Sequence, residues 1–433
     1  FVDGMTEALI TDLSKIGALK VISRTSAMRY KDAEKPISEI ARELNVDAVI
    51  EGSVVREGNR VGITAQLIEV ATETNLWADR YEREIASILT LQGEMARAIA
   101  GEIEVTLTPG EEALLTRERE IDPEAYENYL KGQSNWQTLT PAGFDAAEAY
   151  FEAALEKDPD YAQAHAGMAM VWAGRQQFGL VPPSVAGPKA KAAALRALEI
   201  DDSVAEAHGA LAGIETWTEW NWEAGEASFR RAIELNPNLA DVRAFYAHFL
   251  AIMRRPDEAM AQMQRALELD PYNGLFPLLN GIVLEDTGRC EEALAFYSSV
   301  LERMPTNTGA LGGMVRGNYC LGRYEETYEA AVANWTGRGR PDAVRALEAG
   351  YEEGGFAGAM GALADWKQEQ FGLCEGFNLA AAGRTEEALD CLDSQIEQHD
   401  PNMPYIGTAV TLRALREEPR FQDLLRRMNL PAS

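Results

Sequence analysis

The sequence contains few cysteines and histidines and has no long apolar run. Only 4 Cys and 4 His occur among its 433 residues, and none follows a CxxC or His-linked metal spacing. The longest nearly apolar stretch, residues 274–284, is much shorter than the roughly 20 residues that a membrane-spanning helix needs. We therefore expect no metal site, no cofactor and no membrane span in this chain.

The four cysteines occupy helix positions that core residues usually take. Cys290 and Cys320 belong to neighbouring repeats of the region described below, and Cys374 and Cys391 lie further along the chain. The prediction is buried free thiols, with a Cys290–Cys320 disulfide as the alternative. The cysteines therefore indicate no cellular compartment.

Basic residues are scarce relative to acidic ones. Lys and Arg number 40 and Asp and Glu number 69, which gives a net charge of −29. Such a charge repels phosphate backbones, so we expect no nucleic-acid partner. The simpler interpretation of the charge is a well-solvated surface, and the functional one is a preference for basic partners. With 46% hydrophobic residues at this length, the chain can form two or more cores.

Three proline-terminated segments repeat with one period. Pro237, Pro271 and Pro305 follow one another at intervals of 34 residues, the period of a helix–turn–helix repeat. In each unit a small residue is followed four positions later by a bulky one, and three positions further by a small or branched one. The residues concerned are Gly225, Phe229 and Ala232, then Ala259, Met263 and Ala266, then Ala293, Tyr297 and Val300. These spacings keep the side chains on one helical face, where the small residue lets two helices approach.

This pattern resembles the tetratricopeptide repeat, which implies an all-α solenoid. The same offsets recur at Ala147, Phe151 and Ala154, and the pattern weakens beyond residue 337. Insertions at residues 179–189 and 216–222 are expected to lengthen loops inside the stack. Residues 418–431 are expected to form a capping helix. We therefore assign residues 122–433 to the solenoid.

Residues 1–108 follow a different pattern, in which helical and strand-like stretches alternate. The expected elements are helices at 5–17, 36–46 and 87–107, and strands at 18–24, on both sides of a turn at 57–59, and at 75–82. This order indicates a small α/β domain with a mixed sheet and helices, so the overall class is α+β. Residues 109–121 are expected to be a charged linker helix.

Residues 1–108 also resemble the TolB-like amino-terminal domain that accompanies tetratricopeptide repeats in bacterial signalling proteins. The resemblance lies in residues 3–26 and 40–82 and in the helix that carries Gln92. That family has a strand before the first helix, whereas this chain starts at the helix with Phe1 instead of Met. We therefore expect a fragment with an unpaired sheet edge beside residues 19–23, unless another segment covers that edge. The resemblance implies that a kinase, a nucleotide cyclase or a DNA-binding domain lies upstream, sometimes with a membrane span.

The first helix of each pair should line the inner surface of the solenoid. The positions at fixed offsets from each repeat end predict a groove lined by Gln163, Met170, Glu206, Thr216, Asp241, His248, Ile282, Glu285, Arg316 and Tyr319. Mixed polar and apolar groups fit an extended peptide or a partner helix. They fit a solvated surface as well.

Other conspicuous residues have structural interpretations. His165 and His208 occupy equivalent repeat positions and lack the i, i+4 spacing of a helical metal site. Trp217, Trp220 and Trp222 are expected to pack over a hairpin end, or alternatively to anchor a partner. The glycine-rich stretch at 354–360 lacks the Lys-Ser/Thr of a phosphate loop and indicates close helix packing.

The sequence thus favours a non-enzymatic protein-interaction module, the regulatory or sensory part of a larger bacterial signalling protein. No nucleophile–base pair is recognisable, and Gly52 between Glu51 and Ser53 indicates close packing rather than a nucleophile elbow. The alternative is an α/β domain that binds a small ligand or has an unrecognised activity, with the solenoid as adaptor. The compartment stays open between cytoplasm and periplasm.

Overall fold

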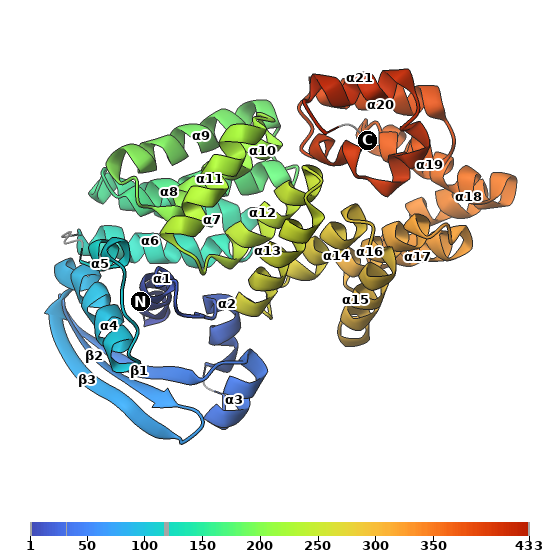
Figure 1. Cartoon of the computed structure of the whole chain (residues 1–433). Coiled ribbons are helices and arrows are strands. Elements are labelled where there is room, and N and C mark those ends of the chain that lie inside the picture. The colour runs from blue at the N-terminus through green and yellow to red at the C-terminus, as the bar shows by residue number, and fades with distance from the viewer. Residues whose placement is uncertain (1, 32, 117–120, 432–433) are drawn as a thin grey trace. The chain divides into compact units, whose positions relative to one another are not determined.

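The computed structural model describes residues 2–31, 33–116 and 121–431 and contains two compact units (Figure 1). Unit 1 comprises Phe1–Ile214, Glu223–Val242 and Ala266–Asn273. Unit 2 comprises Glu215–Trp222, Arg243–Arg265 and Gly274–Ser433. Each unit is described by itself below.

A three-stranded antiparallel sheet lies near the start of unit 1. Its strands β1 (Ala48–Glu57), β2 (Arg60–Glu69) and β3 (Thr74–Glu84) pair in the order β1-β2-β3. Gly58 has a φ of 61°, which the tight turn between β1 and β2 requires and which glycine adopts without steric cost. The expected strands around this turn and at 75–82 are confirmed. The sheet is antiparallel, so the expected mixed sheet is wrong.

Helices α1 (Val2–Ser14) and α4 (Ile88–Glu102) lie on one face of the sheet (Figure 1). Alternate residues of β2 are buried on this face, where Ile63 joins Met5 of α1 and Leu91 of α4 in one core. Period-two alternation on a strand and a 3.6-residue stripe on a helix produce this contact. The expected helices at 5–17 and 87–107 are therefore confirmed within a few residues.

Residues 18–24 form no strand in the described structure, which corrects the sequence prediction. Instead the chain runs irregularly to the short helix α2 (Arg24–Ala27) and the 3₁₀ turn η1 (Met28–Tyr30). The backbone N–H of Ser23 donates to the carbonyl of Leu269 at 2.8 Å, a residue of the repeats. Because this backbone N–H group bonds to a repeat residue and not to a neighbouring strand, the segment does not add a fourth strand to the sheet. Residues 19–23 therefore do not border an open strand edge, and repeat residues contact them instead.

Two short helices complete this part of unit 1. Helix α3 (Ile37–Leu44) ends at Asn45, which has a left-handed φ of 51°. Helix α5 (Pro109–Leu115) begins with a capping box, in which Thr108 and Glu111 exchange hydrogen bonds. It forms the first part of the expected linker helix. Residues 117–120 of that linker lie outside the described residues.

The remaining helices form consecutive antiparallel pairs. They are α6 (Pro123–Trp136), α7 (Pro141–Lys157), α8 (Ala162–Gln177), α9 (Pro183–Ile200), α10 (Ala205–Trp217), α11 (Trp222–Leu235), α12 (Ala240–Ile252), α13 (Pro256–Leu269), α14 (Phe276–Asp286), α15 (Cys290–Arg303), α16 (Thr308–Cys320), α17 (Tyr324–Gly337), α18 (Pro341–Phe371), α19 (Gly376–Ala381) and α20 (Thr385–Glu397). Two 3₁₀ turns, η3 (Met403–Gly407) and η4 (Val410–Leu415), then lead to α21 (Pro419–Arg427). Helix α21 confirms the expected terminal helix at 418–431.

The alternation of small and bulky residues works as the repeat pattern predicts. In unit 2, a Cβ atom added to Gly281 or Gly313 would fall 2.0 or 2.1 Å from the Tyr297 ring, so this ring fills the space that two glycines leave. In unit 1, Phe151 fills the corresponding space beside Gly132 and Gly167. Both rings are fully buried. Small residues on one helix therefore accept the bulky residue of the next, which is how the helices reach close packing.

The insertion at 179–189 is mostly helical, which corrects the expected loop. Helix α9 begins at Pro183 and continues through Pro188, so only the first few inserted residues form the loop. Pro183 stands at the first helical position, where a missing N–H costs no hydrogen bond, whereas Pro188 lies inside the helix. Phe178 and Leu180 remain exposed beside this loop.

Helix α18 is two helices joined by a sharp kink. Gly354 and Gly355 have non-helical backbone angles, and Gly355 has a φ of 62° and a ψ of −148°. The two arms touch at Gly350 and Gly358, where an added Cβ would lie 2.4 or 2.1 Å from the opposite carbonyl oxygen. The expected close helix packing around 354–360 is thereby confirmed.

The four cysteines form two disulfides, so the prediction of free thiols is wrong. Cys290 pairs with Cys320 across a Cα–Cα distance of 6.1 Å, and Cys374 pairs with Cys391 across 5.6 Å. The start of α15 lies beside the end of α16 because the two helices are antiparallel. That geometry brings together residues that are 30 positions apart. The alternative weighed for Cys290 and Cys320 is the correct one.

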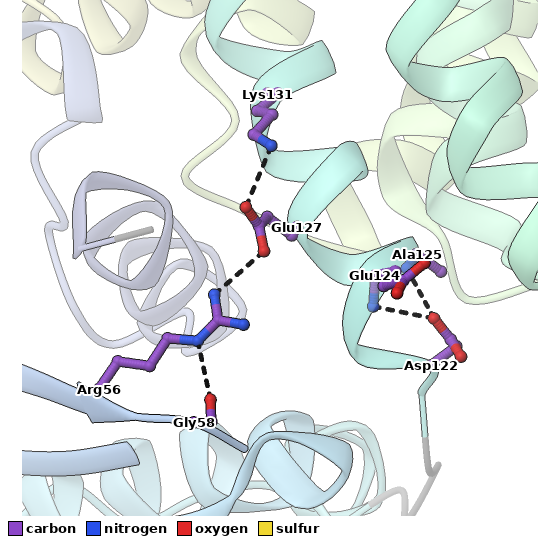
Figure 2. Close-up of polar contacts among 7 residues, drawn as sticks. All are labelled: Arg56, Gly58, Asp122, Glu124, Ala125, Glu127 and Lys131. Atoms are coloured by element: carbon purple, nitrogen blue, oxygen red, sulfur yellow. Dashed lines mark hydrogen bonds and ion pairs between the residues drawn. The ribbon is translucent and has the colours of Figure 1, made fainter. Parts of the chain in front are cut away.

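The sheet and the first repeat share one core within unit 1. Tyr126 and Leu130 of α6 pack in the same buried cluster as Met5, Ile63 and Ile88. Polar contacts add to this core at its edge. In Figure 2 the Arg56 guanidinium donates to a Glu127 carboxylate oxygen at 3.0 Å, and Lys131 contacts the other oxygen at 3.0 Å. These two cations hold the pKa of Glu127 below its ordinary value.

Helix α6 has a strong amino-terminal cap, also visible in Figure 2. A carboxylate oxygen of Asp122 accepts the backbone N–H groups of Glu124 and Ala125 at 2.8 and 3.0 Å. Pro123 occupies the first helical position. Together these residues fix the point at which α6 starts.

Candidate functional site

In unit 1, the loops of the repeats contact the main chain of residues 14–26, which run from the end of α1 into α2. The Asn238 side-chain amide donates to the backbone carbonyls of Ser14 and Ile16 at 3.0 and 3.4 Å. Its oxygen accepts the N–H of Val21 at 3.5 Å. Asn238 is almost fully buried, so these bonds satisfy polar groups that water does not reach.

The next loop of the repeats continues this recognition. Ser26 donates its hydroxyl hydrogen to Asp270 at 2.5 Å and accepts the backbone N–H of Tyr272 at 3.0 Å. The Arg29 guanidinium lies 4.6 Å from the centre of the Tyr272 ring. Main-chain bonds, a buried serine and a cation over an aromatic ring are the contacts by which proteins bind extended peptides.

A desolvated polar cluster lies where α1 meets the repeats. Gln137 donates to a Glu7 oxygen at 3.2 Å and accepts from Arg24 at 2.6 Å, and the Arg24 Nε lies 3.5 Å from the other Glu7 oxygen. Burial raises the pKa of Glu7 to about 7, against the opposing attraction of Arg24, and the Glu206 charge raises it further. Glu7 therefore titrates near neutral pH.

This titration predicts a pH-dependent stability. The folded pKa of Glu7 lies above its unfolded value of 4.5, so its stabilisation is complete below pH 4.5 and declines as the pH rises towards 7. The shift corresponds to about 3 kcal/mol. In urea unfolding at pH 5 and pH 8, Glu7→Gln is expected to lose less stability between the two pH values than the wild type does. The exposed Glu152→Gln should behave as the wild type. An equal pH dependence in all three proteins would contradict the prediction.

The predicted groove residues of unit 1 differ in their exposure. Gln163 and Met170 are half-buried on α8. Glu206 on α10 is half-buried, and burial raises its pKa while Lys15 of α1 opposes the rise. Asp241 on α12 is exposed, and desolvation by the surrounding protein and the Asp270 charge raise its pKa to about 6. Asp241 is thus the most accessible of the four.

The predicted groove residues of unit 2 are mostly covered. Thr216 is fully buried and Ile282 is half-buried. Glu285 is buried and accepts from Arg316 at 2.7 Å and from the Tyr297 hydroxyl at 2.9 Å. Glu285 and Arg316 therefore form an internal ion pair, and they are poor candidates for direct partner contacts.

His248, another predicted groove residue, belongs to a buried hydrogen-bonded chain with the carboxy-terminal segment. The Trp217 indole N–H donates to the Tyr405 hydroxyl at 3.1 Å, and this hydroxyl lies 3.0 Å from His248 Nδ1. His248 Nε2 lies 3.0 Å from the Leu279 carbonyl oxygen. The consistent assignment has Nε2 protonated and donating to Leu279, with Tyr405 donating to Nδ1. Burial lowers the pKa of His248 to about 4, so the ring is neutral at pH 7.

Sequence reasoning missed Tyr405 and the segment around it. Arg254 donates to the Gly407 carbonyl at 2.9 Å, and Met403, Ile406 and Leu412 are fully buried. Residues 403–415 thus cover this part of the inner surface of unit 2. They have no repeat period, and their contacts are more than a hundred positions away. No local signal in the sequence could identify them.

The three tryptophans also contact the carboxy-terminal segment. The Trp220 ring stacks on His399 with a centroid separation of 4.4 Å, and the Trp222 N–H donates to the Met428 carbonyl at 2.7 Å. They have the packing role favoured above, but their neighbours come from the far end of the chain.

The two equivalent histidines have matching local contacts. In each, Nε2 lies 3.0 Å from the backbone carbonyl oxygen of the residue six positions earlier. That residue is Pro159 for His165 and Asp202 for His208.

In the described part of the chain, no group of three or more His, Cys, Asp or Glu could hold a metal ion. Among the same residues, no helix has the length and apolar character of a membrane span.

Comparison with known proteins identifies the repeat type. Residues 240–273 match the model of the tetratricopeptide repeat. A solved structure of a thermophilic TPR protein from Thermus thermophilus is 20% identical, with a TM-score of 0.36, and covers 46% of this chain and 98% of its own. Residues 240–273 are therefore a repeat of the tetratricopeptide type.

Two curated relatives are longer proteins. The chain is 36% identical over 220 residues to "Putative adenylate cyclase 3" of Rhizobium meliloti (strain 1021), a match that covers 50% of this chain and 37% of that protein. It is 24% identical over 243 residues to "Transcriptional regulator HilA" of Salmonella typhimurium, covering 55% of this chain and 42% of the regulator. The chain thus spans about two-fifths of the length of these relatives.

Proposed function

We propose that the tetratricopeptide repeats bind segments of partner proteins. The observation that carries this proposal is the hold of the repeat loops on residues 14–26 through Asn238, Leu269 and Asp270. A surface that already satisfies the main chain of an irregular segment has the chemistry that peptide recognition needs. The groove defined in the sequence analysis remains part of the proposal, with Asp241 as its most accessible residue.

We further propose that the chain is the regulatory part of a larger bacterial signalling protein. The names of the two curated relatives, an adenylate cyclase and a transcriptional regulator, support this context. On this proposal residues 1–108 are the TolB-like part, residues 109–121 the linker and residues 122–433 the repeat part. An enzymatic or DNA-binding domain would then belong to the rest of the protein. The packing of the sheet against α6 favours an interaction role over a free-standing ligand-binding domain.

Asp241→Lys tests the groove. The tagged chain is expected to capture a discrete set of proteins from a lysate of its source bacterium. Reversing this exposed charge should reduce the recovery of at least one of them by about tenfold, because the reversal replaces attraction to a basic partner group with repulsion. The captured proteins are quantified by mass spectrometry, and circular dichroism checks the fold.

Glu152→Lys is the matched control because it reverses an exposed carboxylate on α7. It should retain full capture. Equal recovery with both variants would remove Asp241 from the binding surface. A wild-type chain that captures nothing beyond the empty resin would overturn the binding function itself.

A further inference from the structure

Five aromatic rings gather on α16, α17 and α18 of unit 2 (Figure 1 shows these helices). We call this group the aromatic surface; it consists of Tyr319, Tyr324, Tyr328, Tyr351 and Phe356. Tyr324 stacks on Phe356 with a centroid separation of 5.0 Å, and Tyr319 lies 5.7 and 5.8 Å from the same two rings. Tyr328 stacks on Tyr351 at 3.9 Å. The rings therefore form two adjoining stacked groups.

The aromatic surface is open to solvent. Tyr324 is 51% exposed, and the other four rings are half-buried. A buried cluster that includes Leu347 packs against Tyr328, Tyr351 and Phe356, and this packing fixes the orientation of the three rings. Large aromatic side chains that are rigid and exposed together are typical of binding surfaces.

The kink in α18 produces this arrangement. Tyr351 and Phe356 lie on opposite sides of Gly354 and Gly355, which have non-helical backbone angles. An uninterrupted helix would place residues five apart on different faces. The break lets Phe356 reach Tyr324 while Tyr351 reaches Tyr328.

Carboxylates are frequent on the helices that carry the rings. Helix α17 presents exposed Glu325, Glu326 and Glu329, and α18 presents exposed Glu348, Glu352 and Glu353. Within the described residues none of these six carboxylates has an ion-pair partner. Burial raises the pKa of Tyr328, and the nearby charges of Glu348 and Glu352 add to the rise.

Several cations lie on the same helices, and most of them pair with other carboxylates. Arg316 pairs with Glu285, Arg340 with Asp342 and Lys367 with Glu375, and Arg323 extends to Glu291 at 3.7 Å. The six glutamates still outnumber the remaining cations, which are Arg338 and Arg345 on these helices and Arg413 near Tyr319. A negative surface with open ring faces attracts cationic side chains, because cations bind to ring faces and to carboxylates.

We infer that the aromatic surface binds an arginine- or lysine-rich segment of a partner protein. The inference rests on the proposed function, that the repeats bind protein segments, and names a second surface and the chemistry of its partner. The guanidinium or ammonium groups lie over Tyr324 and Tyr351, and the glutamates neutralise the remaining charge. The overall charge of −29 excludes a nucleic-acid competitor for this surface.

A labelled peptide tests the inference on the full chain. The probe is a fluorescein-labelled dodecapeptide of alternating arginine and glycine, followed by fluorescence anisotropy at 150 mM salt. Tyr324→Leu removes one ring face and is expected to raise Kd about three- to tenfold. Tyr324→Phe keeps the ring face and should retain the wild-type Kd.

The controls separate this surface from general attraction to an acidic protein. Phe178→Leu removes a ring of similar exposure, 50%, in unit 1 and should leave Kd unchanged. The double variant Glu325→Gln/Glu352→Gln should weaken binding more than Glu152→Gln/Glu156→Gln, which removes two exposed charges on α7. A dodecapeptide of alternating glutamate and glycine should not bind.

Two results would overturn the inference. One is an unchanged Kd for Tyr324→Leu, and the other is an equal loss for Tyr324→Leu and Phe178→Leu. If lysate capture still depends on Asp241 in either case, only this inference fails and the proposed function stands. If capture is absent as well, both fail.

Discussion

Gly358→Val is expected to lower the free energy of unfolding by at least about 3 kcal/mol, the upper range for overpacked interiors. A Cβ atom at Gly358 would fall 2.1 Å from the Gly350 carbonyl oxygen in the facing arm of α18. Both partners in this clash are backbone atoms, so no change of side-chain rotamer relieves it. Urea unfolding followed by far-ultraviolet circular dichroism measures the loss.

Gly361→Ala is the matched control in the same arm of α18. Its Cβ would lie 3.6 Å from the Cβ of Ala382, which is an ordinary van der Waals contact. Alanine also favours the helix over glycine by about 1 kcal/mol, so this variant should be at least as stable as the wild type. If Gly358→Val is as stable as Gly361→Ala, the two arms of α18 do not approach as closely as the structure shows.

Tyr405→Phe is expected to cost about 2–4 kcal/mol, although it removes only one oxygen atom. That hydroxyl accepts from Trp217 and donates to His248, so its loss removes one hydrogen bond from each of two buried groups. Each such group carries a desolvation cost of about 1–3 kcal/mol. Urea unfolding monitored by tryptophan fluorescence reports directly on this region.

The same network predicts acid sensitivity. The folded pKa of His248, about 4, lies below its unfolded value of 6.5, so the stabilisation is complete above pH 6.5 and is lost as the pH falls towards 4.

Tyr324→Phe is the control for Tyr405→Phe, because the Tyr324 ring is exposed and should tolerate loss of its hydroxyl. Equal stability of Tyr405→Phe and Tyr324→Phe would contradict the buried network.

The repeated and locally patterned parts of the fold could be predicted from the sequence. The 34-residue period reports which residues face the neighbouring helix, and Tyr297 fits between Gly281 and Gly313 as that period requires. The β1–β2 hairpin was equally predictable, since Gly58 marks its turn and alternation marks its strands. Both signals arise from neighbours in the chain.

The errors share a physical origin, which is contact between distant segments. Residues 18–24 have a strand-like composition, but Ser23 bonds to Leu269 instead of a sheet neighbour. The cysteines show no recognised spacing, because antiparallel helices determine which of them meet. Tyr405 has no period at all, yet it completes the polar contacts of Trp217 and His248.

The candidate site was only partly accessible to sequence reasoning. Repeat offsets identified Asp241, which is exposed, but they also selected Glu285 and His248, which the chain itself covers. The groove remains a prediction. The aromatic surface escaped notice except for Tyr319, because its rings come from three helices and from both sides of a kink.

The core that joins the sheet to α6 has a mechanical consequence. Met5 and Ile63 on one side and Tyr126 and Leu130 on the other are parts of a single buried cluster. If the sheet and the repeats were expressed as separate fragments, each would expose the apolar residues of this cluster to solvent, so neither fragment is expected to be stable alone. A force applied to the sheet is therefore transmitted to the first helical pair through this shared core.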